Sequence, residues 1–254
     1  MTRKEIIIGT RASRLALSQA RQVAARLKAS WPEYSFKLKE ITTTGDRNRS
    51  QDLAEIKGKG VFIKEIEAAL LEAEIDLAVH SAKDVPAKLP AGLKLGPTPR
   101  RADPRDVLVT EAGTGLDDLP DGARLGTGSL RRRAQLLNYR LGLEFKSIRG
   151  NVDTRLEKLR TEPYDGLILA AAGLERLGCK AEITDYLAPE VCLPAARQGA
   201  LALEIRAGDD DLERLLAPIE HKPSRRAVAA ELAAMELLDG GCKVPLGIYA
   251  RPAE

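Results

Sequence analysis

The stretch Leu125-Gly-Thr-Gly-Ser-Leu-Arg-Arg-Arg-Ala-Gln-Leu136 decides which fold the sequence predicts. A short apolar run ends in a Gly-Thr-Gly-Ser turn, and a helical pattern begins directly after it. The first turn of a helix has unbonded N–H groups and partial positive charge, so it repels cations. Arg131, Arg132 and Arg133 nevertheless occupy this turn, which predicts an anion between them. The alternative is that the arginines extend into solvent or pair with carboxylates elsewhere in the chain.

The same pattern occurs at the start of the chain, in Glu5-Ile-Ile-Ile-Gly-Thr-Arg-Ala-Ser-Arg14. A β-branched strand runs into Gly-Thr, and a helix follows whose apolar positions are Ala16, Ala20, Val23 and Leu27. Two strand–turn–helix units about one domain apart predict two α/β halves that share one cleft. Neither a dinucleotide-binding G-x-G-x-x-G motif nor a P-loop is present in these turns.

Strands and helices are expected to alternate along the rest of the chain, which predicts mostly parallel sheets. The expected strands cover 36–41, 75–80, 144–148 and 166–170, and the expected helices cover 63–70, 152–159 and 224–238. The five prolines between Pro86 and Pro104 leave no room for a regular element and indicate a crossing between lobes. The segment from Pro189 to Pro194 indicates the return crossing.

The composition limits the function classes. The chain has 254 residues, 44% hydrophobic and 30% charged, which is typical of a folded globular protein. A net charge of +3 and only 4% aromatic residues argue against a nucleic-acid-binding module. No stretch is long and apolar enough to span a membrane, so no membrane partner is expected. Three cysteines indicate a reducing, cytoplasmic location, and two histidines without a Cys/His cluster predict no metal site.

His80-Ser-Ala-Lys-Asp-Val-Pro86 contains the strongest acid/base candidate in the sequence. In a cleft rich in arginine, the Asp84 carboxylate would stay ionised and could stabilise a cation that develops on a substrate. Asp84 could equally be a turn residue that hydrogen-bonds its own backbone, and this segment alone does not separate the two interpretations. His80 is expected to be a packed residue at the end of a strand.

The three cysteines differ in context. Cys192 lies in an apolar Val-Cys-Leu-Pro stretch and is expected in the core, and Cys179 is expected at the surface. Cys242 follows Gly240-Gly241 at the end of an expected helix and precedes a lysine, which favours thiolate character. The sequence therefore predicts that Cys242 is the reactive or modified cysteine.

Taken in order, these motifs resemble the porphobilinogen deaminase (hydroxymethylbilane synthase) family along almost the whole chain. The matching stretches are 8–19, 42–46, 59–62, 80–86, 126–135, 149–155, 169–177 and 240–247. The resemblance implies an α/β fold of two periplasmic-binding-protein-like domains joined by hinge crossings, with a shortened third α/β domain. The implied domains are residues 1–99 with 200–217, residues 100–199, and residues 218–254, which carry the cofactor cysteine.

The resemblance also implies a transferase of tetrapyrrole and heme biosynthesis. Such an enzyme joins four porphobilinogen units head to tail, with loss of ammonia, into the linear tetrapyrrole hydroxymethylbilane. The implied cofactor is a dipyrromethane held by a thioether bond to Cys242, and the implied catalytic residue is Asp84. The implied cofactor-binding residues are Ser81, Lys83, Thr127, Ser129, Arg131, Arg132 and Arg155. The implied substrate-binding residues are Arg11, Ser13, Gln19, Arg149, Arg155 and Arg176.

Several positions depart from the family pattern. Ala196-Arg197 replaces the usual Val-Gly, Leu232 replaces an arginine, Lys243 replaces a glutamine or small residue, and Ala82 replaces a Met or Leu. Relatives also continue further beyond the cysteine loop. An alternative expectation is therefore a non-catalytic binder of polycarboxylate pyrroles or other small anions. In both cases the expected protein is a monomer whose partner is a small molecule, porphobilinogen.

Overall fold

The computed structural model describes residues 4–44, 63–238 and 245–251. Two strand–turn–helix units repeat within it, as the sequence predicts. The Ser13 hydroxyl accepts a hydrogen bond from Ala16 N (3.3 Å) at the start of α1, and the Ser129 hydroxyl accepts one from Arg132 N (3.4 Å) at the start of α4. Each serine therefore caps its helix and satisfies one of the N–H groups that the first turn leaves unbonded.

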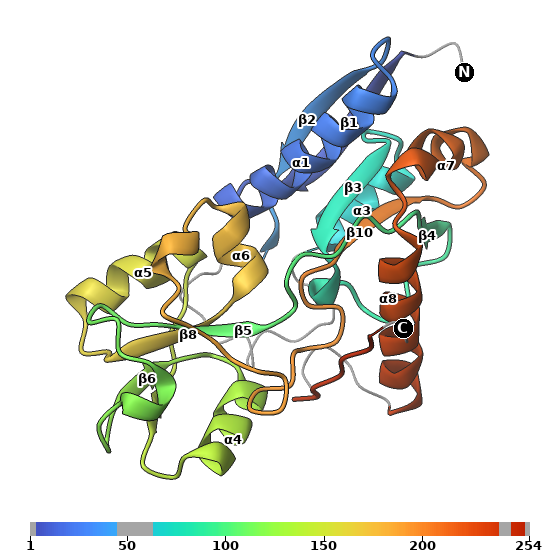
Figure 1. Ribbon diagram of the computed structural model, residues 1–254. Coiled ribbons are helices and arrows are strands. Elements are labelled where there is room, and N and C mark those ends of the chain that lie inside the picture. Colours follow the sequence, from blue (N-terminus) through green and yellow to red (C-terminus); the bar gives the residue numbers. More distant parts are fainter. Residues whose placement is uncertain (1–3, 45–62, 239–244, 252–254) are drawn as a thin grey trace.

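The described strands form two five-stranded sheets, one in each lobe (Figure 1). The first sheet contains β1 (Glu5–Arg11), β2 (Ser35–Ile41), β3 (Leu77–Ser81), β4 (Leu93–Leu95) and β10 (Leu201–Arg206). The second contains β5 (Asp106–Val109), β6 (Arg124–Gly126), β7 (Glu144–Lys146), β8 (Gly166–Ala170) and β9 (Asp185–Tyr186). The helices are α1 (Arg14–Ser30), α3 (Lys64–Leu71), α4 (Leu130–Tyr139), α5 (Val152–Thr161), α6 (Ala171–Arg176), α7 (Asp210–Leu216) and α8 (Lys222–Leu237).

The two sheets have equivalent strand orders, β2-β1-β3-β10-β4 and β7-β6-β8-β5-β9. In each sheet the three consecutive βα strands are parallel, as expected. The fourth strand, β10 or β5, is antiparallel to both of its neighbours, which the sequence did not predict. Each of these two strands is the first one that the chain forms after crossing from the other lobe. It therefore enters its sheet from the opposite end, and the two crossings lie side by side as a hinge.

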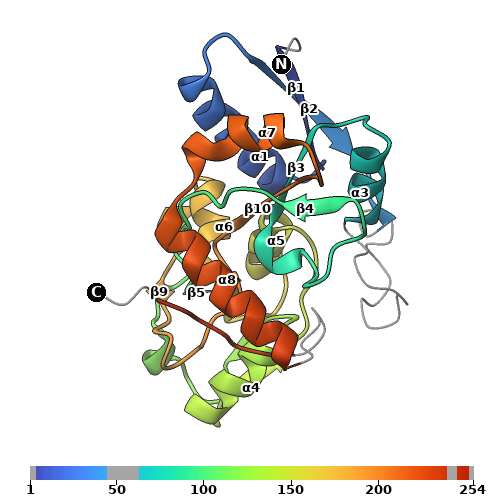
Figure 2. The same ribbon diagram turned by 90° about the vertical axis from the view of Figure 1, so that its right-hand side faces the viewer.

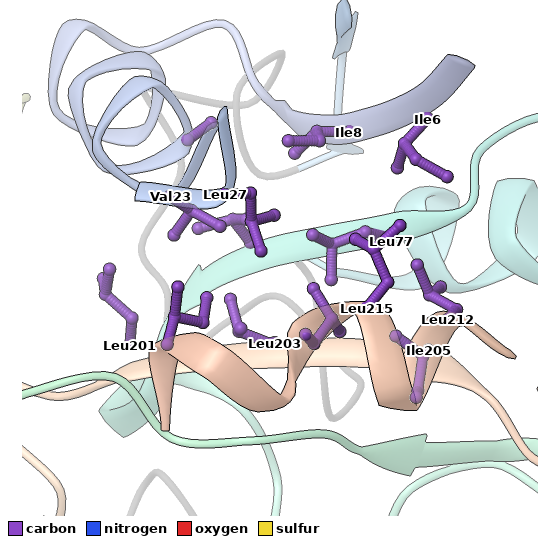
Figure 3. Close-up of a cluster of buried hydrophobic side chains, with 14 residues drawn as sticks. Ile6, Ile8, Val23, Leu27, Leu77, Leu201, Leu203, Ile205, Leu212 and Leu215 are labelled. Atoms are coloured by element: carbon purple, nitrogen blue, oxygen red, sulfur yellow. The ribbon is translucent and has the colours of Figure 1, made fainter. Parts of the chain in front are cut away.

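The first lobe has its core between the sheet and the two helices α1 and α7 (Figure 3). Val23 and Leu27 of α1 are fully buried against Ile6, Ile8 and Leu77 of the strands, which confirms the apolar stripe read from the sequence. In the second lobe, alternate residues of β8 point to opposite faces. Leu167 and Leu169 pack on the side of α5 and α6, whereas Ile168 packs on the side of α4.

Helix α8 lies across the first lobe and the crossings (Figure 2). Val228 packs with Ala82, Val85, Ala200 and Ala202. The described residues that follow Glu220 form this helix and one isolated bridge, between Ala195 and Gly247. In the described part, the apolar side of α8 is therefore covered by the first lobe and not by a sheet of its own.

Most expected elements are confirmed within one to three residues at each end, and one expectation is wrong. The proline-rich stretch 86–104 contains a regular element, β4, between Pro90 and Pro97. Three residues fit there because β4 is an edge strand that bonds to β10 alone, so the prolines flank the ladder and remove no N–H from it.

Gly199 fixes how closely the two crossings approach. Its φ is +84°, and an added Cβ would lie 2.6 Å from the Ala102 carbonyl oxygen. We expect Gly199→Ala to lower the free energy of unfolding by about 1–3 kcal/mol more than Gly208→Ala. Gly208 is the matched control, because its φ is +83° and nothing lies within 4 Å of its Cβ position. Urea unfolding measures both variants, and equal losses would mean that the crossings can separate without cost.

Candidate functional site

A cavity of about 590 Å³ lies between the two lobes. Its lining residues come from the carboxyl ends of β1, β3 and β8, from the first turns of α1 and α5, and from the return crossing. This is where ligands bind in sheets of this kind, because strand ends and helix N-termini meet there. The sequence-predicted site residues that line the cavity are Arg11, Ser13, Gln19, Ser81, Lys83, Asp84, Arg132, Arg149, Arg155 and Arg176.

The lining carries a large excess of positive charge. Among the described lining residues Asp84 is the single carboxylate, and the cationic ones are Arg11, Lys83, Arg132, Arg149, Arg155, Lys158 and Arg176. Burial, together with nearby Arg132 and Arg149, lowers the pKa of Arg155 to about 10. Burial, together with Arg26, lowers the pKa of Arg176 to about 10. Burial is the main cause of both shifts, and the excess of positive charge in the described lining suits the cavity to a ligand with several carboxylates.

Lys83 is a further cation of the lining whose pKa is lowered. Burial lowers its pKa to about 8, and the charge of Arg132 adds to this effect, whereas Asp84 opposes it. Its ammonium group donates a hydrogen bond to Gln198 Oε1 (3.2 Å). Gln198 in turn donates from Nε2 to the carboxylate of Asp106 (2.8 Å) and to the Pro104 carbonyl (2.8 Å). A chain of hydrogen bonds therefore joins the cavity wall to a buried carboxylate behind it.

Asp106 is the anion that the sequence predicted between Arg131 and Arg132, and it belongs to the chain itself. Its side chain is fully buried. It accepts from Arg131 at 2.7 Å and from Arg132 at 3.0 and 2.7 Å. The interpretation that an external anion separates the two arginines is thus wrong, and pairing with a carboxylate elsewhere in the chain is correct. Burial alone would raise the pKa of Asp106, but the two arginines hold it well below its usual range.

Three expected cofactor-binding residues do not line the cavity. Arg131 is buried and also donates to the Leu193 carbonyl (2.5 Å), so its guanidinium is turned toward the return crossing. The Ser129 hydroxyl caps α4, and the Thr127 hydroxyl accepts from Ser129 N (3.2 Å). These three side chains hold the turn and the helix start in place, and Arg132 is the arginine of this turn that faces the cavity.

Asp84 lies at the end of a 3₁₀ turn, Ala82–Asp84, that directly follows β3. It is exposed to the cavity, and in the described part of the chain no hydrogen bond involves its carboxylate. It also borders a smaller adjoining cavity of about 70 Å³. The geometry therefore does not support a residue that merely caps its own turn.

His80 is buried at the end of β3, as expected, and its Nε2 lies 3.1 Å from Glu204 Oε2. Burial and the charge of Glu204 raise the pKa of neighbouring Glu67, although His80 opposes this shift. His80 is therefore a packed residue that contacts the buried Glu204 side chain.

Hydrogen bonds hold three of the expected substrate-binding residues in place. Gln19 donates to the Ser81 hydroxyl (2.8 Å), which joins α1 to β3. Arg176 donates to the Gly199 carbonyl (2.7 Å), and its own carbonyl accepts from Ser18 (2.7 Å) on α1. Arg155 donates from Nε to the Gly150 carbonyl (2.8 Å), and this bond fixes the direction of the Arg155 side chain.

The cysteines follow the expectations where the structure describes them. Cys192 is fully buried, and burial together with Asp106 raises the pKa of its thiol to about 12. Cys179 is partly buried and is also a free thiol. Cys242 and Lys243 lie outside the described residues. Among the residues that are described, no His, Cys, Asp and Glu side chains gather into a metal-binding group, and no helix could cross a membrane.

Sequence reasoning missed three residues of this site. Asp106 is the first residue of the otherwise apolar strand β5. A carboxylate at the start of such a strand could have indicated a buried counterion. Gln198 sits in the Arg-Gln-Gly stretch of the return crossing, which was noted only for its departure from the family. Lys158 lies one turn after Arg155 on the cavity-facing side of α5, so helical spacing could have predicted it.

Comparisons with known proteins identify the family. A family model described as "Porphobilinogen deaminase, dipyromethane cofactor binding domain" matches residues 6–214. The chain belongs to this family. It is 50% identical over 247 residues to the porphobilinogen deaminase of Brevibacillus brevis, covering 97% of this chain and 80% of that protein. It is 52% identical over 248 residues to the porphobilinogen deaminase of Bacillus mycoides, again covering 97% and 80%.

A solved structure supports the fold. An ancestral cationic amino acid solute binding protein matches with a TM-score of 0.50 and 12% identity, covering 93% of this chain and 91% of that one. The periplasmic-binding-protein-like, two-lobed α/β fold expected from the sequence is thereby confirmed. At this identity the similarity concerns the fold alone.

The pair of arginines around Asp106 gives a stability prediction. We expect Asp106→Asn to lower the free energy of unfolding by about 3–5 kcal/mol, because it leaves two buried guanidinium groups without their counterion. Asp121→Asn is the control, since that carboxylate is 86% exposed and its contact with Arg140 is 3.4 Å long. Its removal should leave stability essentially unchanged. A small loss in the Asp106 variant would show that the arginines find another anion.

The same contact predicts a pH dependence. The pKa of Asp106 is depressed in the folded protein and about 3.9 in the unfolded chain, so its contribution is complete above roughly pH 5. The contribution is lost as the pH falls toward the folded-state pKa. Between pH 5 and 2.5, wild-type stability should therefore fall more steeply than that of Asp106→Asn. Thermal melts across this range measure the difference, and parallel curves would contradict it.

Proposed function

We propose that the protein is the hydroxymethylbilane synthase of tetrapyrrole biosynthesis, joining four porphobilinogen units head to tail with loss of ammonia. Family membership over almost the whole chain carries this proposal. The cation-rich cavity supports it, because each added ring brings an acetate and a propionate group that need positive partners. Nothing in the described site favours the alternative of a non-catalytic anion binder.

The chemistry of the cavity fits a dipyrromethane cofactor. Such a group carries four carboxylates, and the described lining offers several guanidinium and ammonium groups against one carboxylate. We propose that Ser81, Lys83, Arg132 and Arg155 hold it, with Thr127, Ser129 and Arg131 supporting them from behind, and that Cys242 forms its thioether bond. When bound, the dipyrromethane supplies the pyrrole end to which the first substrate unit is joined.

The substrate carboxylates are assigned to the opposite side of the cavity. Arg11 and Arg176 come from the first lobe and from α6, and Arg149 and Arg155 frame the start of α5. Ser13 and Gln19 add hydroxyl and amide groups near the N-terminus of α1, where the helix dipole favours an anion. The site would therefore orient the substrate by its acidic side chains and leave its aminomethyl group free to react.

Asp84 would act on the reacting ring. Among the described lining residues it is the single carboxylate, so it offers a negative charge within a strongly cationic lining. It can accept a hydrogen bond from the pyrrole N–H and stabilise the positive charge that develops as ammonia leaves. The surrounding cations repel a free pyrrolic cation, so this charge is stabilised only next to Asp84.

The proposed role of Asp84 predicts a loss of turnover without a loss of fold. Asp84→Asn removes the charge and should lower kcat on the order of 10²–10³-fold or more. Its melting temperature should stay close to that of the wild type, because the carboxylate is exposed and takes part in no hydrogen bond within the described chain. Asp84→Glu, which keeps the charge, is the control and should retain more activity. Near-normal steady-state rates in the Asn variant would refute the role.

The proposed attachment at Cys242 predicts which thiol carries the cofactor. Intact mass spectrometry of the wild type should show an adduct, and Cys242→Ser should remove it. Cys192→Ser and Cys179→Ser are matched controls and should keep it, because the Cys192 thiol is buried with a pKa of about 12 and Cys179 lies away from the cavity. An adduct that persists in the Cys242 variant would overturn the assignment.

We further propose the domain limits expected from the sequence: 1–99 with 200–217, 100–199, and 218–254. The sheets support the first two limits, because β10 pairs with the strands of the first sheet, whereas β5 to β9 form the second sheet. A monomer is proposed, as expected from the sequence. A cytoplasmic location is proposed on the free thiols of Cys179 and Cys192.

A further inference from the structure

Arg197, in the return crossing, has an unusual combination of backbone and burial. Its φ is +63°, in the left-handed region that residues other than glycine rarely adopt. Its side chain is among the largest fully buried ones in the described chain. A buried guanidinium on a strained backbone persists only where the surrounding structure requires it, and such strain concentrates near functional sites.

The contacts of Arg197 point toward the Lys83–Asp84 turn. Its guanidinium donates from Nη2 to the carbonyl of Val85, the residue that directly follows Asp84. Its backbone N–H donates to Glu231 Oε2 (2.5 Å) on α8. Glu231 is itself fixed by Arg101, whose two Nη atoms lie 2.6 and 3.2 Å from its carboxylate oxygens. Arg197 is therefore anchored on one side and holds the catalytic turn on the other.

Two further contacts join the same segments. The Ala82 N–H donates to the Ala200 carbonyl (3.0 Å), and the Lys83 ammonium donates to Gln198 Oε1 (3.2 Å). Residues 197–200 of the return crossing thus bond to the beginning, the middle and the end of the turn, at Ala82, Lys83 and Val85. The bond from Arg197 is the one at the end, next to Asp84.

The Asp84 carboxylate has no hydrogen bond of its own in the described chain, so its direction follows from the backbone that carries it. The 3₁₀ turn beneath it is closed by a long bond, from Val85 N to the Ala82 carbonyl (3.4 Å). The Val85 carbonyl is buried, and a buried carbonyl needs a donor. Removal of the guanidinium leaves the buried Val85 carbonyl without this donor, and the turn that carries Asp84 loses one of its three bonds to the crossing.

We propose that Arg197 is a positioning residue for the reaction: its guanidinium, through the Val85 carbonyl, sets the direction in which Asp84 faces the substrate. The inference rests on the proposed role of Asp84. Because the donor sits in the hinge crossing, it also makes the direction of Asp84 depend on the arrangement of the two lobes.

The test compares Arg197→Met, which keeps bulk and removes every donor, with Arg197→Lys, which keeps one. We expect Met to lower kcat on the order of tenfold or more with KM for porphobilinogen within about twofold, because misdirection of a catalytic group affects the transition state more than binding. Lys should restore kcat to within about threefold. Hydrogen–deuterium exchange in the peptide covering 82–85 should become faster in the Met variant and recover in the Lys variant.

Arg206→Met is the matched control. Arg206 donates to the Leu70 (3.0 Å) and Ile75 (2.7 Å) carbonyls at the far end of the first lobe. Its removal should lower the melting temperature without changing kcat or exchange at 82–85. Equal effects of the two Met variants on kcat, or an unchanged exchange rate in Arg197→Met, would overturn the proposal.

A double-variant cycle separates this inference from the function on which it rests. In an Asp84→Asn background, Arg197→Met should change the residual rate by less than about twofold, because the group that it positions is gone. A full tenfold effect in that background would overturn the positioning role alone. If Asp84→Asn itself keeps normal turnover, the proposed role of Asp84 fails, and the role of Arg197 fails with it.

Discussion

The site depends on one buried interaction, the Asp106 carboxylate between Arg131 and Arg132. Two guanidinium groups at the positive end of a helix would repel each other and the helix. Asp106 neutralises them from inside the second lobe and also accepts from Gln198 of the return crossing. The same carboxylate thus stabilises the start of α4, holds Arg132 at the cavity wall and ties the hinge to the sheet.

This counterion explains how the cavity can remain strongly positive. A buried carboxylate behind the wall reduces the cost of holding the cations together, yet it offers no charge to the ligand. Burial is the main cause of the lowered pKa values of Lys83, Arg155 and Arg176, and repulsion from nearby cations adds to it. A ligand with several carboxylates relieves this repulsion, so the binding free energy comes from charges that the fold has already brought together.

The hinge does more than connect the lobes. Gly199 lets the outward and return crossings touch, while Arg197, Gln198 and Ala200 bond the turn that carries Lys83 and Asp84. Glu231 of α8 then fixes both crossings through Arg101 and Arg197. Direct hydrogen bonds therefore join the return crossing to the turn that carries Lys83 and Asp84.

The sequence by itself determined what depends on local pattern. The Gly-Thr turns, the serine caps, the apolar stripe of α1 and the buried Cys192 all follow from neighbours along the chain, and the motif order identifies the family. The sequence could not determine which segments that lie far apart along the chain contact one another in space. The partner of Arg131 and Arg132 lies about 25 residues away, on a strand whose direction is reversed by the crossing. Which cations face the cavity, and which are neutralised behind it, was decided only by the tertiary structure, because charges act through space and not along the sequence.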